Sequence, residues 1–125
     1  MSTYNKVTLI GNLTGDPELR HTKNGKAVAD MSLALNRTYT VQPSGERREE
    51  TTYIDVVLWN RQAELASQYL KKGRSVLVEG RLQEDSWQDK TSGQTRKKIR
   101  VVAERLQFMN EARNSEPAIE AEAAM

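Results

Sequence analysis

The sequence of 125 residues contains no cysteine and a single histidine. Without cysteine the chain cannot form a disulfide, a thiolate metal site or a cysteine nucleophile. His21 alone cannot build a multi-histidine metal site, and it is the one histidine that a Ser-His-Asp triad could use. No phosphate-binding glycine loop, HExxH or GxSxG motif is present. We therefore expect no enzymatic activity, no cofactor and no metal.

Long apolar stretches are also missing. The longest runs of apolar residues extend over only a few positions, whereas a membrane-spanning helix needs about 20. The N-terminal residues lack the apolar segment of a secretory signal. The length suits one domain with its own core and is too short for two. These features predict a small intracellular domain that does not enter a membrane.

The net charge of +2 conceals an uneven distribution of charge. Residues 1–110 hold 18 basic and 13 acidic groups, a net charge of +5, whereas residues 111–125 hold one basic and four acidic groups, a net charge of −3. The acidic segment is rich in alanine and glutamate, and it has too little apolar surface to fold on its own. We therefore predict one domain over residues 1–110 and a short disordered acidic tail over residues 111–125.

Periodic apolar residues predict five strands with one helix between the third and the fourth. The strands are expected at residues 4–13, from 27 onward, 51–59, 75–87 and 96–108. The helix is expected at residues 61–70, with Asn60 as its cap and Gly73 at its end. Residues 43–48 are predicted to form a mobile polar loop. This order is typical of an all-β, five-stranded Greek-key barrel, the OB-fold, and an α+β sheet with the helix on one face is the alternative.

The third predicted strand carries apolar side chains on both faces. Ile54, Val56 and Leu58 form an aliphatic face suited to a core, and Tyr53 and Trp59 alternate onto the other face. In the fourth strand, Val76, Val78 and Leu82 are expected to share one face, with Gly80 permitting a bend. Large aromatic side chains opposite a sufficient aliphatic face indicate either a second layer of structure or a binding surface.

Four of the seven aromatic residues lie outside the aliphatic pattern: Tyr39, Tyr53, Trp59 and Trp87. In an OB-fold the second and third strands and the flanking loops form the binding platform. Aromatic faces at intervals can stack on the bases of single-stranded nucleic acid, and they do so without reading sequence. The four positions are therefore predicted to stack on bases, and packing at a subunit interface is the alternative.

Basic residues accompany these aromatic positions. One group is spread between residues 6 and 81, and a second cluster begins the last strand with Arg96, Lys97, Lys98 and Arg100. Runs of basic residues indicate an electrostatic footprint for phosphates more reliably than any single side chain does.

Many short motifs, in order and over residues 3–109, closely resemble the bacterial-type single-stranded DNA-binding protein family. They include Asn5-Lys6-Val7, Leu9-Ile10-Gly11-Asn12-Leu13, Asp16-Pro17-Glu18-Leu19-Arg20, Val56-Val57-Leu58-Trp59, Tyr69-Leu70-Lys71-Lys72-Gly73 and Val78-Glu79-Gly80-Arg81-Leu82. The resemblance implies an OB-fold homotetramer that binds single-stranded DNA without sequence preference in replication, recombination and repair. It implies a cytoplasmic, nucleoid-associated location. It places base stacking on the four aromatic positions and phosphate or groove contacts on Lys6, Arg20, Arg61, Lys72 and Arg81.

Two departures from the family pattern carry expectations of their own. Asp55 lies between Tyr53 and Trp59, and Glu84 and Asp85 approach Trp87, so binding is expected to be weaker or more salt-sensitive than in some relatives. Family members often end in an acidic tip with a terminal phenylalanine that docks replication and repair proteins. This chain ends Glu-Ala-Ala-Met, which has the acid but not the aromatic end and does not favour docking by that route.

Three other functions stay open on the sequence. A primosome-type OB-fold adaptor would bind single-stranded DNA only within a complex and would form a dimer. An OB-barrel nuclease would need clustered carboxylates around a metal, and the sequence shows no such cluster. RNA binding also stays open, because stacking does not read the 2′-hydroxyl.

Overall fold

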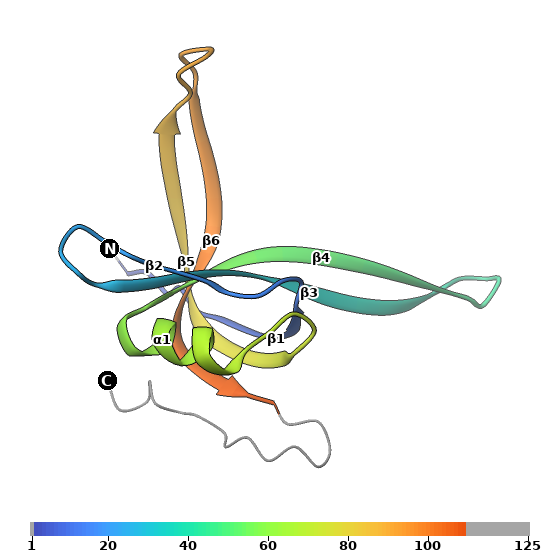
Figure 1. The fold of residues 1–125 in the computed structure, drawn as a ribbon. Helices are drawn as coiled ribbons and strands as arrows, with labels where there is room; N and C mark the ends of the chain where they lie inside the picture. The colour runs from blue at the N-terminus through green and yellow to red at the C-terminus, as the bar shows by residue number, and fades with distance from the viewer. Residues whose placement is uncertain (1, 110–125) are drawn as a thin grey trace.

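The computed structural model describes residues 2–109, and the predicted tail at residues 111–125 lies outside the described residues. Six strands and one helix follow one another along the chain (Figure 1). They are β1 (Val7–Leu13), β2 (Glu18–His21), β3 (Ala27–Val41), β4 (Glu46–Trp59), α1 (Asn60–Tyr69), β5 (Ser75–Gln88) and β6 (Thr95–Phe108). The predicted elements are all present, and β2 is an additional short strand.

The strands form one sheet in the order β1-β5-β6-β4-β3-β2, and β1 also pairs with β3. That extra pairing closes β1, β5, β6, β4 and β3 into a five-stranded barrel, with β2 attached to β3 at its side. β4 and β6 run parallel, and every other pair is antiparallel. A closed five-stranded barrel with a helix between its third and fourth strands confirms the predicted OB-fold over the α+β alternative.

Alternating side chains of the strands fill the barrel, as the sequence pattern predicts. Val56 and Leu58 of β4 are buried, and Ile54 packs against the same core at its edge. The helix adds Ala63 and Ala66, which are fully buried. Figure 1 shows α1 beside the barrel, away from the projecting ends of the strands. No helix of the described residues is long and apolar enough to cross a membrane.

The prediction of a polar loop at residues 43–48 is wrong in its second half. β3 and β4 stay paired as far as Val41 and Glu46, so residues 46–48 belong to β4. Exposed cross-strand pairs support this extension, because Arg37 donates to Glu50 at 2.8 Å and Thr51 donates to Asn36 at 2.8 Å. The result is a long hairpin that projects from the barrel, and β5 and β6 form a second one (Figure 1).

The prediction that Asn60 caps the helix is also wrong. Trp59 occupies the N-cap position, and no side chain caps the helix by a hydrogen bond. Asn60 instead takes a left-handed backbone conformation with φ of 58°, which asparagine tolerates better than most residues. The chain thus turns from β4 into α1 directly after Trp59.

The three residues predicted to share one face of β5 differ in burial, because Leu82 is 44% exposed. Val76 and Val78, on the same face of β5, are fully buried. The difference arises at Gly80, where the pairing of β5 with β6 shifts register and the strands begin to leave the barrel. A side chain at Gly80 would overlap the carbonyl oxygen of Val102. Glycine is therefore required for the close approach of β5 and β6 at this bend.

We predict that Gly80→Ala lowers the free energy of unfolding by about 1–3 kcal/mol, the usual cost of an overpacked site. Gly15→Ala is the matched control, because no atom lies within 4 Å of a methyl group added there. Urea unfolding of both variants at one protein concentration measures the effect. Equal stability of the two variants would contradict the role assigned to Gly80.

Candidate nucleic-acid interface

The four strands β3 to β6 share one face that points away from the core. Tyr53, Asp55, Val57 and Trp59 of β4 alternate with buried residues, and the register aligns them with alternate residues of β3. β6 pairs with β4 through Val57 and Val102, and alternate residues of β5 and β6 face each other, so the same face continues across both strands. We call this surface the outer face: residues 28, 30, 32 and 34 of β3; 53, 55, 57 and 59 of β4; 81, 83, 85 and 87 of β5; and 96, 98, 100 and 102 of β6.

Three of the four predicted stacking residues lie on the outer face. Tyr53 is 66% exposed and Trp87 is 50% exposed. They stand on the two projecting hairpins, whereas Trp59 lies at the end of β4 beside the barrel. Large aromatic side chains this exposed present ring faces to solvent, which is the arrangement that base stacking requires.

Trp59 is held more firmly than the other two. It is partly buried and packs against a small apolar cluster of Val28, Val57 and Val102, all on the outer face. This cluster is separate from the barrel core. Trp59 therefore has a structural role in addition to the base stacking predicted for it.

Tyr39 does not share this face. The register pairs Ala34 with Tyr53 and Tyr39 with Arg48, and Tyr39 follows Ala34 by five positions, an odd offset. Because successive side chains point to opposite sides of a strand, Tyr39 lies on the other side of the hairpin from Tyr53. Its ring lies under the guanidinium of Arg37, 5.2 Å from the ring centroid. The structure thus groups three of the four aromatic residues and leaves Tyr39 apart.

The five predicted phosphate contacts divide in the same way. Arg81 belongs to the outer face and pairs with Glu104 at 3.4 Å. Arg20 of β2 stands opposite Val28 and continues the face. Lys6, Arg61 and Lys72 are exposed outside these strands, and their side chains make no ion pair with another described residue.

The outer face also contains three cations that were not among the predicted contacts. Arg96, Lys98 and Arg100 alternate along β6, with Arg96 directly opposite Trp87 and Lys98 opposite Asp85. The sequence contains the pattern that would have placed them. Arg96, Lys98 and Arg100 fall on every second position before Val101, and because Val101 is buried in the core, the three cations must lie on the opposite face of the strand. They were predicted only as a cluster of charge.

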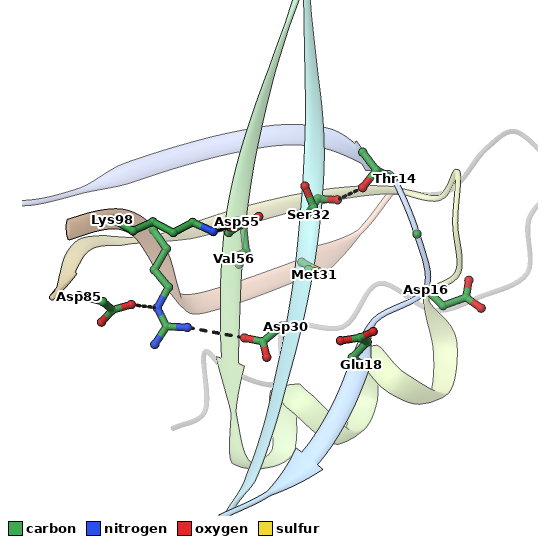
Figure 2. A pocket seen from close by; sticks show the side chains of 12 residues that line it. Thr14, Asp16, Glu18, Asp30, Met31, Ser32, Asp55, Val56, Asp85 and Lys98 are labelled. Atoms are coloured by element: carbon green, nitrogen blue, oxygen red, sulfur yellow. Dashed lines mark hydrogen bonds and ion pairs between the residues drawn. The ribbon is translucent and has the colours of Figure 1, made fainter. Parts of the chain in front are cut away.

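Carboxylates on the outer face pair with these cations. Lys98 forms an ion pair with Asp55, and Arg100 Nε lies 2.6 Å from Asp85 Oδ2. Arg100 also reaches Asp30 at 3.6 Å, and Arg20 contacts Asp30 at 3.0 Å. Figure 2 shows Lys98 beside Asp55, with Asp85 and Asp30 on either side of the guanidinium. The outer face is therefore largely neutralised by its own side chains.

A cleft of about 390 Å³ opens beside these ion pairs (Figure 2). Its lining combines the turn after β1, the start of β2, two core residues and part of the outer face: Thr14, Gly15, Asp16, Glu18, Asp30, Met31, Ser32, Asp55, Val56, Asp85, Lys98 and Arg100. Across residues 2–109, no group of three histidine, cysteine or carboxylate side chains is placed to hold a metal ion. The cleft thus offers hydrogen-bonding and charged groups next to the stacking residues.

The tip of the β5–β6 hairpin is organised by Asp89. Its carboxylate accepts a hydrogen bond from the backbone N–H of Thr91 at 2.8 Å and one from Arg96 Nε at 3.2 Å. The Thr91 hydrogen bond is the main cause that lowers the pKa of Asp89, and Ser92 and Arg96 act in the same direction. These bonds fix the turn just beyond Trp87.

We predict that Trp59→Ala and Trp87→Ala differ in their effect on stability. Removing Trp59 should lower the free energy of unfolding by about 1–3 kcal/mol, less than for a fully buried aromatic, because it strips cover from Val28, Val57 and Val102. Removing half-exposed Trp87 should change it by less than about 0.5 kcal/mol. Urea unfolding at equal protein concentration checks the pair, and equal losses would contradict the packing role of Trp59.

The chain is similar in sequence to known proteins over most of its length. The chain is 47% identical over 119 residues to a single-stranded DNA-binding protein of Wolinella succinogenes, covering 95% of this chain and 72% of that one. It is 48% identical over 107 residues to a single-stranded DNA-binding protein of Helicobacter hepaticus, covering 86% of this chain and 62% of that one. The chain thus spans about two thirds of the length of these relatives.

Solved structures resemble the fold over most of this chain. An SSB of Plasmodium falciparum in complex with ssDNA matches 88% of this chain and 98% of its own, with 26% identity and a TM-score of 0.78. A deletion mutant of the single-stranded DNA binding protein of Thermus aquaticus matches 93% of this chain and 54% of its own, with 37% identity and a TM-score of 0.75. The family model of the single-strand binding proteins matches residues 4–109, and the chain belongs to that family.

Proposed function

We propose that this protein binds single-stranded DNA without sequence preference and protects it during replication, recombination and repair. One observation supports this most directly. Tyr53, Trp59 and Trp87 share a single face of the barrel with the alternating cations of β6. Membership of a family of binding proteins, not of enzymes, removes the nuclease alternative.

Base stacking supplies the part of binding that does not depend on sequence. Every base has a π-face, and one stacked base contributes about 1–3 kcal/mol. Tyr53 and Trp87 present exposed rings on separate hairpins, while Trp59, at the barrel end of β4, is held against the apolar cluster of Val28, Val57 and Val102. A flexible strand could therefore meet the three rings in turn as it crosses the outer face.

Phosphate contacts supply the electrostatic part. Arg96, Lys98 and Arg100 of β6 and Arg81 of β5 lie among the aromatic residues, and Arg20 extends the same face. Lys6, Arg61 and Lys72 lie off this face and would contact DNA only where the strand leaves it. Tyr39 would likewise stack only on DNA that wraps around the edge of the β3–β4 hairpin. The protein would act in the cytoplasm, at the nucleoid, where single strands are exposed.

We predict that Trp87→Ala and Tyr53→Ala each weaken binding of a dT oligomer by about 1–3 kcal/mol, the contribution of one stacked base. Tryptophan fluorescence titration measures the affinity of the wild type and of Tyr53→Ala. Because Trp87→Ala removes one of the two tryptophans, its affinity is measured by the fluorescence anisotropy of a labelled oligomer. Tyr4→Ala is the control, because Tyr4 is 86% exposed but precedes the strands. Unchanged affinity in both variants would refute stacking on the outer face.

The titration also separates the remaining functions. A wild-type protein that binds oligo-U much more tightly than oligo-dT would indicate an RNA-binding role. Failure of the isolated protein to bind either oligomer would favour the adaptor, which needs a complex.

We also propose that the protein assembles as a homotetramer. Assembly would bury large apolar side chains that a single chain leaves exposed, among them Ile10 at 56% and Ile99 at 52%. Neither belongs to the outer face, so such an interface would leave the DNA surface free.

Light scattering coupled to gel filtration tests the assembly. The expected mass is that of four chains of 14.2 kDa. A dimer, stable to dilution, would contradict the tetramer and would favour the adaptor alternative.

A further inference from the structure

The carboxylates of the outer face stand where they oppose a polyanion. Asp55 lies two residues from Tyr53 on the same face, and Asp85 lies two residues from Trp87. Each is only partly exposed, with 42% and 32% of its side chain accessible. On β4 and β5 both carboxylates lie nearer the barrel than the two rings, so a DNA strand that follows the outer face from ring to ring passes beside them.

Both carboxylates already form ion pairs with the cations that a phosphate would contact. Asp55 pairs with Lys98, and Asp85 pairs with Arg100, which Asp30 contacts from its other side. Lys98 and Arg100 alternate on β6 between the strands that carry Tyr53 and Trp87. Phosphates would thus compete with aspartates for the same two cations.

The pairing of Arg100 is incomplete. Its Nε is buried and lies 2.6 Å from Asp85, yet it makes no hydrogen bond to any described residue. The contact is therefore an ion pair with poor hydrogen-bond alignment. A pair with poor alignment is held less firmly than an aligned one, so a phosphate that displaces Asp85 and aligns with the guanidinium could replace it.

From these contacts we infer that Asp55 and Asp85 act as internal counterions that limit the affinity of the outer face for DNA and flatten its dependence on salt. This inference rests on the proposed function and goes beyond it. When a phosphate takes Lys98 or Arg100, the freed aspartate remains beside the DNA as an uncompensated negative charge. That charge opposes binding most strongly at low salt, where screening is weakest.

The sign of the salt effect follows from the same exchange. Each phosphate neutralised on a single strand releases counterions and steepens the salt dependence by about 0.7 log units per log unit of salt. A freed aspartate takes up cations in return, and it loses its repulsion as salt rises. Binding should therefore be less salt-sensitive with the aspartates than without them, which reverses the expectation drawn from the sequence.

The test compares Asp55→Asn, Asp85→Asn and wild type in binding dT oligomers over a series of salt concentrations. Each variant should bind about two- to fivefold more tightly at low salt, the range typical of an exposed ion pair. The gain should shrink as salt rises, so that the slope steepens by up to about 0.7 for each cation released. Glu64→Gln on α1 changes the net charge equally on an exposed residue outside the outer face and should alter neither quantity.

A second comparison separates the ion pair from a general change of charge. Asp55→Asn is repeated in a Lys98→Ala background, where no cation remains for Asp55 to hold. The gain from Asp55→Asn should be smaller there than in the wild-type background. An equal gain in both backgrounds, a gain matched by Glu64→Gln, or a loss of affinity in the aspartate variants would overturn the inference. Wild-type protein that fails to bind dT would instead overturn the proposed function.

Discussion

Alternation of side chains along closed-barrel strands is the constraint on which the rest of the structure depends. Once Ile54, Val56 and Leu58 are committed to the interior, Tyr53 and Trp59 must point outward. The register of β3 with β4 and of β5 with β6 carries this parity across four strands. The same hydrophobic pattern that closes the core therefore also sets which side chains reach the outer face.

The outer face combines two kinds of attraction with a restraint. Exposed rings offer stacking, and cations of β6 offer charge, but aspartates hold Lys98 and Arg100 before DNA arrives. A binding surface of unopposed cations would depend steeply on salt. A protein that coats single strands must also release them when an enzyme needs the strand as a template. Internal counterions provide a physical means to moderate affinity without removing the cations.

The sequence was informative wherever apolar residues alternate along the whole length of a strand. It predicted the barrel, the core of β4 and the placement of Tyr53, Trp59 and Trp87 outside the aliphatic pattern. It failed where strands leave the barrel. Burial no longer enforces alternation there, so the exposure of Leu82 did not follow from the pattern and residues 46–48 were assigned to a loop.

Cross-strand partners were the second limit. The position of Tyr39 on the opposite side of its hairpin follows from a register count across a turn that the sequence does not fix. The pairing of Asp55 with Lys98 joins residues 43 positions apart in the chain, and only the fold brings them together. The acidic residues could be noticed in the sequence, but the cations that they pair with could not be identified from it.

The most direct test of the outer face as the DNA surface is photo-crosslinking with an oligomer that carries 5-iodo-deoxyuridine, followed by mass spectrometry of the linked peptides. A halogenated base in contact with an aromatic ring links to it, so the experiment reports which rings stack. The account predicts crosslinks at Tyr53, Trp59 and Trp87. Crosslinks confined to Tyr4 and Tyr39, with none on the outer face, would contradict it.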